Sequence, residues 1–264
     1  MVAIDQFRDR VVLLVGAGRG MGKAAAERFA EVGATVVIGD IVPSIESDFE
    51  ALARRHAGLR GFGTHIDVTD PESCVAAVER TVAEFGRLDV MANFAGVIQK
   101  ADTVEDLSIE EWDRVMSVNL RGQFLMAKAS VPQFKAQRSG RIILITSIWS
   151  HEGFDLFSAY CASKGGLKIF TQALAKEMIG YGVTVNAIAP GIIDTELHRN
   201  AVRDEAAARG VPEDEILAKE WGKIPTGKPG RPEDIAEAVL YLAADEATYV
   251  SGVSLDVNGL ILIQ

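Results

Sequence analysis

A phenol and an ammonium lie four positions apart in this chain, in the run Ser158-Ala-Tyr160-Cys-Ala-Ser-Lys164. Residues four apart share one face of a helix, so Tyr160 and Lys164 are expected to lie side by side. A nearby cation favours the phenolate and lowers the pKa of a tyrosine. Tyr160 could then take the hydroxyl proton of an alcohol as hydride leaves, or return the proton in the reverse direction.

A serine lies where it could serve the same reaction. Ser147 follows a strand expected over 141–146, thirteen residues before Tyr160. Its hydroxyl could donate a hydrogen bond to the substrate oxygen, with Ser150 as a nearby alternative. Ser147 could also do no more than cap the strand end. The Tyr–Lys spacing can arise by chance, so the elements that position these residues must support the hypothesis.

The stretch 10–40 predicts a strand, a glycine-rich turn, an amphipathic helix and a second strand, which together form one βαβ unit. The strand spans 11–15, the helix about 20–32, and the second strand ends at Asp40. Glycines let the backbone of such a turn approach a ligand closely, and the helix N-terminus then points free N–H groups at an anion such as a pyrophosphate. The glycines are Gly16, Gly18, Gly20 and Gly22.

Asp40 predicts the kind of nucleotide. It lies 40 − 22 = 18 residues after Gly22, near the usual offset of an acid that accepts hydrogen bonds from an adenine-ribose hydroxyl. Its charge would repel a 2′-phosphate, which favours NAD over NADP. Arg19 argues the other way, because a basic side chain in this loop could meet a 2′-phosphate. Alternatively, the glycines only form part of a loop that binds no ligand, and Asp40 is a solvated residue at the end of a strand.

Strands and helices alternate along the rest of the chain, which is typical of a parallel sheet covered by helices on both faces. The prediction is an α/β fold, a Rossmann-type doubly wound parallel sheet, in a single domain over 1–264. Ligands of such sheets bind beyond the carboxyl ends of the strands. The polar and irregular stretch 195–222 is expected to be a helical lid. Further strands are expected at 59–66, 89–94, 141–146, 183–189 and 253–257, and further helices at 43–57, 71–85, 108–136, 158–179 and 232–243.

Composition excludes several classes of protein. The formal net charge of −10 disfavours binding to nucleic acid or to an anionic membrane. With no signal segment and no apolar run long enough to span a bilayer, we expect a soluble cytoplasmic protein. The two cysteines, Cys74 and Cys161, are expected to stay unpaired, and the four histidines lack metal-ligand spacing.

The chain resembles the classical short-chain dehydrogenase/reductases over essentially its whole length, through several motifs in a fixed order. The resemblance implies a catalytic tetrad of Asn119, Ser147, Tyr160 and Lys164. Asn119 would organise a water-linked proton relay to Lys164, whose ammonium would also hold the nicotinamide ribose. The motifs are Gly16-Ala-Gly-Arg-Gly20-Met-Gly22, Asp67-Val68, Asn93-Phe-Ala-Gly96, Asn119, Ser147, Tyr160-x-x-x-Lys164, and Pro190-Gly191 followed by Thr195.

The same resemblance supplies a set of cofactor contacts. Asp67 and Val68 would contact adenine. Asn93 and Gly96 would lie near the adenosine ribose, and Ile193 and Thr195 would contact the carboxamide. Taken singly, Asp67 could be a helix-capping carboxylate and Asn119 an ordinary polar helix residue. The whole set is Gly16, Arg19, Gly20, Met21, Gly22, Asp40, Ile41, Asp67, Val68, Asn93, Gly96, Tyr160, Lys164, Pro190, Gly191, Ile193 and Thr195.

Two residues depart from the family pattern. Val15 stands where threonine is usual, and Phe94 where the second asparagine of Asn-Asn-Ala-Gly is usual. We interpret them as a paired apolar replacement that affects cofactor affinity rather than chemistry, because neither side chain carries a proton or hydride.

Apolar and aromatic residues are expected around the nicotinamide end, which suits a hydrophobic, cyclic or aromatic secondary alcohol or ketone. The alternative is that the aromatic residues pack under the lid as core. Predicted substrate contacts are Ser147, Trp149, Phe154 and Tyr160, and the wider surroundings are Ile98, Gln99, Ile148, His151, Phe157 and the lid.

The resulting hypothesis is an NAD-dependent alcohol dehydrogenase. An NADPH-dependent ketoreductase that uses Arg19 is the alternative, and a nucleotide-binding scaffold without turnover is a third possibility. The resemblance also implies a homotetramer formed through the regions 108–136 and 158–179. The apolar end of the chain, 259–264, is expected to be buried in a subunit contact.

Overall fold

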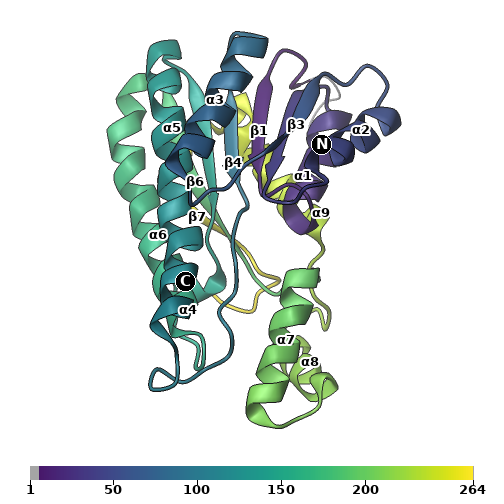
Figure 1. Ribbon diagram of the computed structural model, residues 1–264, viewed down its shortest axis with the longest axis vertical. Coiled ribbons are helices and arrows are strands. Elements are labelled where there is room, and N and C mark those ends of the chain that lie inside the picture. The colour runs from purple at the N-terminus through teal and green to yellow at the C-terminus, as the bar shows by residue number, and fades with distance from the viewer. Residues whose placement is uncertain (1–5, 264) are drawn as a thin grey trace.

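A parallel sheet forms the centre of the computed structural model, which describes residues 6–263 (Figure 1). Its seven strands lie in the order β3-β2-β1-β4-β5-β6-β7, and neighbouring strands run parallel throughout. The doubly wound α/β sheet predicted from the sequence is therefore confirmed. The strands are β1 Val11–Val15, β2 Thr35–Asp40, β3 Gly61–His65, β4 Val90–Asn93, β5 Gly140–Ile145, β6 Val183–Pro190 and β7 Ser254–Val257.

Helices cover both faces of the sheet (Figure 1). Helices α1, α2 and α9 pack against one apolar cluster, through residues such as Phe29, Leu52 and Leu240. Helices α3, α5 and α6 pack against a second cluster, in which Phe134 and Met178 are fully buried. Their bounds are α1 Gly20–Glu31, α2 Ile45–Arg55, α3 Pro71–Phe85, α5 Gly122–Gln137, α6 Ser158–Met178 and α9 Pro232–Ala243.

The chain changes direction across the sheet at β1. From β1 the strand order runs through β2 to β3 on one side and through β4 to β7 on the other. The loops at the carboxyl ends of β1 and β4 consequently diverge, and a crevice opens between them at this switch point. Gly16, Asp40 and Asn93 all lie at this edge of the sheet, as the sequence predicts.

The helical region expected over 108–136 is divided in the structure. Helix α4 spans Ile109–Met116, a wider π-helical turn, η1, spans Ser117–Arg121, and α5 follows directly. The third strand is also shorter than the predicted 59–66. Gly61 begins it with φ +147°, and a Cβ there would lie 1.8 Å from the carbonyl oxygen of Val36.

The predicted lid consists of two helices that extend away from the end of the sheet (Figure 1). These are α7, Glu196–Arg209, and α8, Glu213–Trp221. They hold a small apolar cluster of their own, formed by Val202, Ala206 and Ile216. A segment with so small a core depends on its contacts with the main body for its position.

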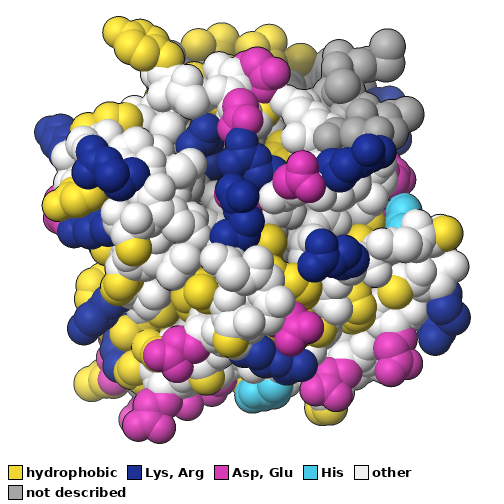
Figure 2. Space-filling view, turned by 90° about the horizontal axis from the view of Figure 1, so that it is seen from above, with side chains coloured by type: hydrophobic (Ala, Val, Ile, Leu, Met, Phe, Trp, Pro, Cys, Tyr) yellow, Lys and Arg dark blue, Asp and Glu magenta, His cyan; other side chains and the backbone are white. Residues whose placement is uncertain are grey.

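Within residues 6–263, no helix has the length and apolar character needed to cross a membrane. The same residues contain no group of three or more His, Cys, Asp or Glu side chains placed to hold a metal ion. Cys74 and Cys161 are both free thiols. On the face shown in Figure 2, Lys and Arg side chains are interspersed with Asp and Glu side chains.

Candidate active site

The turn after β1 and the first turn of α1 each require a glycine. Gly16 has φ +73°, and a Cβ there would lie 2.5 Å from the backbone nitrogen of Ala95. A Cβ on Gly22 would lie 2.2 Å from the carbonyl oxygen of Gly16. Arg19, which precedes α1, makes no side-chain cap to the helix. The first N–H groups of α1 are therefore left to bind an anion, and the cradle fits a dinucleotide pyrophosphate.

The backbone holds the carboxylate of Asp40 beside this turn. Its Oδ2 accepts a hydrogen bond from Gly18 N at 2.9 Å, and its Oδ1 accepts one from Val42 N at 3.3 Å. A carboxylate has about four acceptor positions. Both oxygens consequently keep the capacity to accept hydroxyl groups of a ribose while remaining fixed in place.

Arg19 reaches across the mouth of the crevice to the lid. Its Nη1 lies 3.4 Å from Oε2 of Glu196, at the start of α7, and the two side chains are 63% and 68% exposed. An ion pair this exposed contributes little to stability, about 0–1 kcal/mol. It nevertheless gives the cation of Arg19 an acidic neighbour within the chain.

Two adjoining cavities follow the carboxyl edge of the sheet and together contain most of the predicted cofactor contacts. Asn93 lines neither cavity, because its Oδ1 accepts a hydrogen bond from Ala95 N at 3.0 Å and shapes the turn after β4. Its contact with the adenosine ribose stays a prediction. The first cavity is lined by Gly16, Arg19, Gly20, Met21, Gly22, Asp40, Ile41, Asp67, Val68, Gly96 and Thr195, and the second by Met21, Gly96, Tyr160, Lys164, Pro190, Gly191, Ile193 and Thr195.

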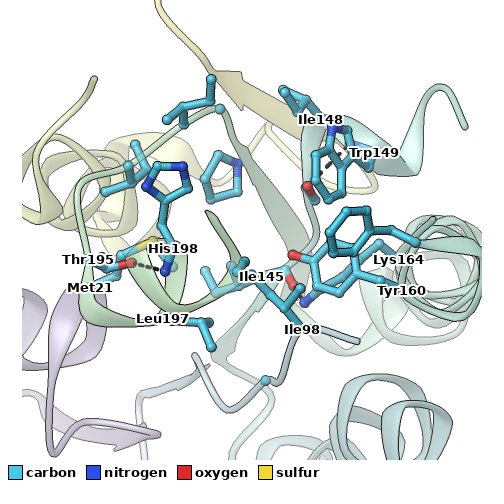
Figure 3. Close-up of a pocket in the computed structure, with 18 of the residues that line it drawn as sticks. Met21, Ile98, Ile145, Ile148, Trp149, Tyr160, Lys164, Thr195, Leu197 and His198 are labelled. Atoms are coloured by element: carbon cyan, nitrogen blue, oxygen red, sulfur yellow. Dashed lines mark hydrogen bonds between the residues drawn. The ribbon is translucent and has the colours of Figure 1, made fainter. Parts of the chain in front are cut away.

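The predicted acid–base pair lies on the wall of the second cavity (Figure 3). Tyr160 and Lys164 project from the first two turns of α6, and the Lys164 Nζ lies 5.6 Å from the centre of the Tyr160 ring. Ser147 lines the same cavity from the end of β5. Ser150 instead donates its hydroxyl to the carbonyl oxygen of Ser147 at 2.6 Å and does not line the cavity. The structure therefore favours Ser147 over Ser150.

Burial dominates the acid–base properties of the pair in the protein alone. It raises the pKa of Tyr160 to about 12, while hydrogen bonding to Ser147 acts in the opposite direction. Burial also lowers the pKa of Lys164 to about 8. The Lys164 ammonium donates a hydrogen bond to the carbonyl oxygen of Ile145 at 2.7 Å. The lowered tyrosine pKa expected from the sequence therefore needs more positive charge than Lys164 alone provides.

Asn119 is fully buried in the π-helical turn η1, where both ends of its amide are bonded. Its Oδ1 accepts a hydrogen bond from Val97 N at 2.8 Å, and its Nδ2 donates to Val97 O at 2.8 Å and to Ser163 Oγ at 3.2 Å. A Cβ on Gly96 would lie 3.4 Å from Asn119 Oδ1 and 3.6 Å from Lys164 Nζ. Asn119 and Lys164 thus border the same glycine.

The predicted apolar surroundings are present around Tyr160, with three exceptions. Ile98, Ile148, Trp149 and Phe157 line the cavity. Phe154 stacks on Trp149 with ring centres 4.5 Å apart and does not itself line the cavity, so its substrate contact stays a prediction. Gln99 accepts a hydrogen bond from Ala159 N at 2.8 Å, and His151 is bonded to Asp256 and Lys168.

Three ionisable lid residues on this cavity are missing from the predicted set. His198 and Glu205 belong to α7, and Glu220 belongs to α8. His198 Nε2 lies 2.8 Å from Oε2 of Glu220. The two residues are 22 positions apart in the chain, on separate helices, and no local spacing indicates that they meet.

Val15 and Phe94 do not form the side-chain pair that we expected. Their backbones are bonded, with Phe94 N donating to Val15 O at 2.7 Å. Their side chains, however, pack into the two different apolar clusters. The two clusters lie on opposite faces of the sheet, so each substitution is accommodated separately.

A family model described as enoyl-(acyl carrier protein) reductase matches residues 16–259. The chain belongs to the short-chain dehydrogenase/reductase family. As a short-chain dehydrogenase/reductase it is an oxidoreductase that uses a nicotinamide cofactor, in agreement with the glycine cradle and the Tyr160–Lys164 pair.

Three relatives of this short-chain dehydrogenase/reductase illustrate the range of activities in the family. It is 37% identical over 255 residues to cis-4-hydroxycyclohexanecarboxylate dehydrogenase of Sinomonas cyclohexanicum, covering 97% of each chain. It is 37% identical over 253 residues to 3-oxoacyl-[acyl-carrier-protein] reductase of Escherichia coli, covering 96% of this chain and 97% of the relative. It is 38% identical over 255 residues to 2,5-dichloro-2,5-cyclohexadiene-1,4-diol dehydrogenase of Sphingobium indicum, covering 97% of each.

Solved structures show the same fold. Levodione reductase superposes with a TM-score of 0.91 at 31% identity, covering 96% of this chain and 97% of that one. A single-substitution variant of actinorhodin polyketide ketoreductase with NADPH superposes with a TM-score of 0.90 at 29% identity, covering 99% of each.

Proposed function

We propose that the protein oxidises a hydrophobic, ring-bearing secondary alcohol, with NAD as the hydride acceptor and Tyr160 as the general acid/base. One observation carries the proposal. Ser147, Tyr160 and Lys164 line an otherwise mostly apolar cavity, and that cavity adjoins the glycine cradle and the carboxylate of Asp40. This arrangement supports a reaction in which the proton-transfer groups lie next to the expected position of the nicotinamide ring.

The chain's own residues orient the alcohol and move its proton. The Ser147 hydroxyl donates a hydrogen bond to the alcohol oxygen, and the phenolate of Tyr160 takes the hydroxyl proton as the carbonyl forms. Lys164 stabilises the phenolate and, together with Asn119, leads the proton toward solvent through water. A bound oxidised nicotinamide supplies the acceptor for the hydride and a positive charge that favours the phenolate.

The choice of NAD rests on the Asp40 carboxylate, which would repel a 2′-phosphate and is fixed at 2.9 Å from Gly18 N. A ring-bearing substrate is supported by Trp149 and Phe157 on the cavity wall. The names of two relatives, which contain a hydroxycyclohexane and a cyclohexadienediol, also describe six-membered rings.

An NADPH-dependent ketoreductase is the second candidate. Arg19 lies at the glycine turn, and its side chain is 63% exposed, so it can leave Glu196 and meet a 2′-phosphate. A similar structure is a ketoreductase with NADPH. In this case the same residues would run in reverse, with Tyr160 donating its proton to the forming alcohol.

Turnover of a panel of cyclic alcohols and ketones, with NAD(H) and NADP(H) side by side, tests both candidates. We expect oxidation with NAD, and a loss of kcat on the order of 10²–10⁴ in Tyr160→Phe, because general acid–base catalysis is removed. NAD should still bind that variant in a fluorescence titration. Tyr241→Phe, on the exposed side of α9, is the matched control.

Three results decide against the proposal. Preference for NADPH would favour the ketoreductase. Comparable turnover in Tyr160→Phe would remove the proposed proton carrier. Nucleotide binding with no turnover of any alcohol or ketone would indicate a scaffold.

A further inference from the structure

The substrate cavity carries an ionisable pair on the wall opposite Tyr160. His198 and Glu220 come from the two lid helices and line the cavity, and Figure 3 shows His198 across the cavity from Tyr160 and Lys164. His198 Nε2 lies 2.8 Å from Glu220 Oε2, and the two side chains are 17% and 13% exposed. Among residues 6–263, nothing is bonded to the other ring nitrogen, Nδ1.

A purely structural role, in which the His198–Glu220 pair holds the two lid helices together, does not explain the pair well. Val202, Ala206 and Ile216 already pack α7 against α8 through apolar contacts. Removing a carboxylate from water carries a desolvation penalty that an apolar contact avoids. A pair that lines a mostly apolar cavity, and in which one ring nitrogen has no bond within the described residues, is better suited to holding a polar group of a ligand.

The charge of this wall limits which polar group it can hold. Glu205 also lines the cavity, and it accepts a hydrogen bond from Arg209 Nε at 2.7 Å. Arg209 also donates to Asp155 Oδ2 at 2.9 Å, so one cation serves two carboxylates. With Glu220 added, the group has a net charge of −2 when His198 is neutral, and of −1 when it is protonated.

The cations near the lid wall do not make its net charge positive. Lys164 is the only Lys or Arg that lines the cavity within the described chain, and it lies on the catalytic side, bonded to Ile145 O. Lys223 lies over the ring of Phe154, 5.3 Å from its centre, and does not line the cavity. Lys219 on α8 is exposed, acts on Asp155 and also does not line the cavity, so counting it leaves the wall with a charge of −1 when His198 is neutral. A ligand carboxylate at the lid wall would therefore meet like charge in a low-dielectric setting.

We infer that His198 and Glu220 form a second substrate anchor, which selects cyclic alcohols that bear a second, neutral hydroxyl over those that bear a carboxylate. This inference rests on the proposed alcohol dehydrogenase function. Glu220 keeps the proton on His198 Nε2, and Nδ1 then accepts a hydrogen bond from the second hydroxyl. Two relatives act, by name, on a ring with a carboxylate and on a ring diol. The lid of this chain suits the diol.

The test compares kcat/KM for cyclohexanol, cyclohexane-1,4-diol and 4-hydroxycyclohexanecarboxylate, each with NAD. The wild-type protein should prefer the diol to cyclohexanol by about fivefold or more, the value of one hydrogen bond, and should use the carboxylate least. His198→Phe should bring the diol-to-cyclohexanol ratio toward one. Glu220→Gln keeps an oxygen that can accept from Nε2 and removes a charge, so it should raise use of the carboxylate relative to the diol.

Glu213→Gln is the matched control, because Glu213 forms an exposed lid ion pair with Arg203 at 3.8 Å and does not line the cavity. It should leave all ratios unchanged. A preference for the carboxylate in the wild-type protein, or unchanged ratios in His198→Phe and Glu220→Gln, would overturn the anchor. If the lid of His198→Phe unfolds, the Glu220→Gln ratios decide. Failure of the wild-type protein to oxidise any of the three would instead overturn the proposed function.

Discussion

The role proposed for Lys164 would oppose the stability of the fold at this residue. Its side chain is almost fully buried, and burial lowers its pKa from 10.5 to about 8. In the folded protein the charged form is therefore disfavoured relative to the unfolded chain. At neutral pH the fold carries this unfavourable free-energy term, which the proposed reaction would explain, because that reaction uses an ammonium beside Tyr160.

The pKa of Lys164 predicts how stability changes with pH. Between pH 8 and 10.5 the folded protein binds fewer protons than the unfolded chain, so stability rises with pH in this window. The gain attributable to this residue is about 3 kcal/mol, or roughly 6–12 °C in Tm. Lys164→Met should lack this gain, whereas Lys176→Met, on the exposed side of α6, should retain it.

Thermal unfolding of the three proteins at pH 7 to 10.5 measures the effect. Effects of the substitution that do not depend on pH shift the whole Tm curve, so the change with pH in the difference between wild type and Lys164→Met isolates the titration of Lys164. Parallel Tm curves for the two would contradict the assignment of a lowered pKa to Lys164.

For single residues, the sequence predicts which side chains could take part in chemistry better than it predicts which of them face the cavity. The Tyr160–Lys164 spacing indicates one helix face, and the structure places the pair together on α6. It is harder to predict which of several neighbouring residues lines the cavity, because a single backbone rotation decides which side chain faces it. Ser150 turns back to the carbonyl oxygen of Ser147, and Phe154 lies behind Trp149.

Among the elements, those fixed by local patterns were predicted with accurate bounds. The glycine turn, the start of α3 at Pro71 and the alternating strands all follow from neighbouring residues. The π-helical turn at Ser117–Arg121 was not predicted. Within it Asn119 bonds to the backbone of Val97, 22 positions away, and no local spacing indicates that contact. The polar contacts of the lid depend in the same way on residues far apart in sequence.

The lid should be the first element to open when one of its ion pairs is broken. In Arg209→Met, Glu205 would remain buried without its cation, at a cost of about 3–5 kcal/mol. The small lid cluster cannot offset this, so amide hydrogen exchange over 196–221 should speed up at least tenfold. The central sheet should keep its protection.

Arg203→Met is the control for this experiment, since Arg203 is 61% exposed and its ion pair with Glu213 is long, at 3.8 Å. It should leave lid exchange within about twofold of wild type. Equal exchange in Arg209→Met and the wild-type protein would show that the Arg209 contacts do not hold the lid.

In the molecule as a whole, the arrangement of the strands determines where a ligand-binding site can form. Because the strands run parallel, the nucleotide cradle and Ser147 lie at the same edge of the sheet, although Gly16 and Ser147 are 147 − 16 = 131 positions apart in the chain. The alternation of strands and helices was sufficient to predict this arrangement. The two cavities share Met21, Gly96 and Thr195 among their lining residues, and this adjacency, which depends on loop packing, was not predictable.

Apolar side chains on α5, α6 and the chain end support the expectation of a homotetramer. Phe124 is 42% exposed, Ile169 61% and Ile263 76%. Such residues commonly mark a subunit contact when they cluster. Light scattering should give about four times the chain mass, and Phe124→Glu with Ile169→Glu should reduce it. A monomeric mass for the wild-type protein at working concentration would exclude the tetramer.

The two backbone bonds that Asp40 accepts have a consequence for cofactor engineering. The same carboxylate that would discriminate between dinucleotides also ties Gly18 of the phosphate turn to the segment after β2. A substitution meant to admit an extra phosphate would therefore loosen the scaffold that positions the rest of the nucleotide. Changing the dinucleotide preference of this protein should therefore require replacement of the whole turn, with new hydrogen bonds to restore its shape.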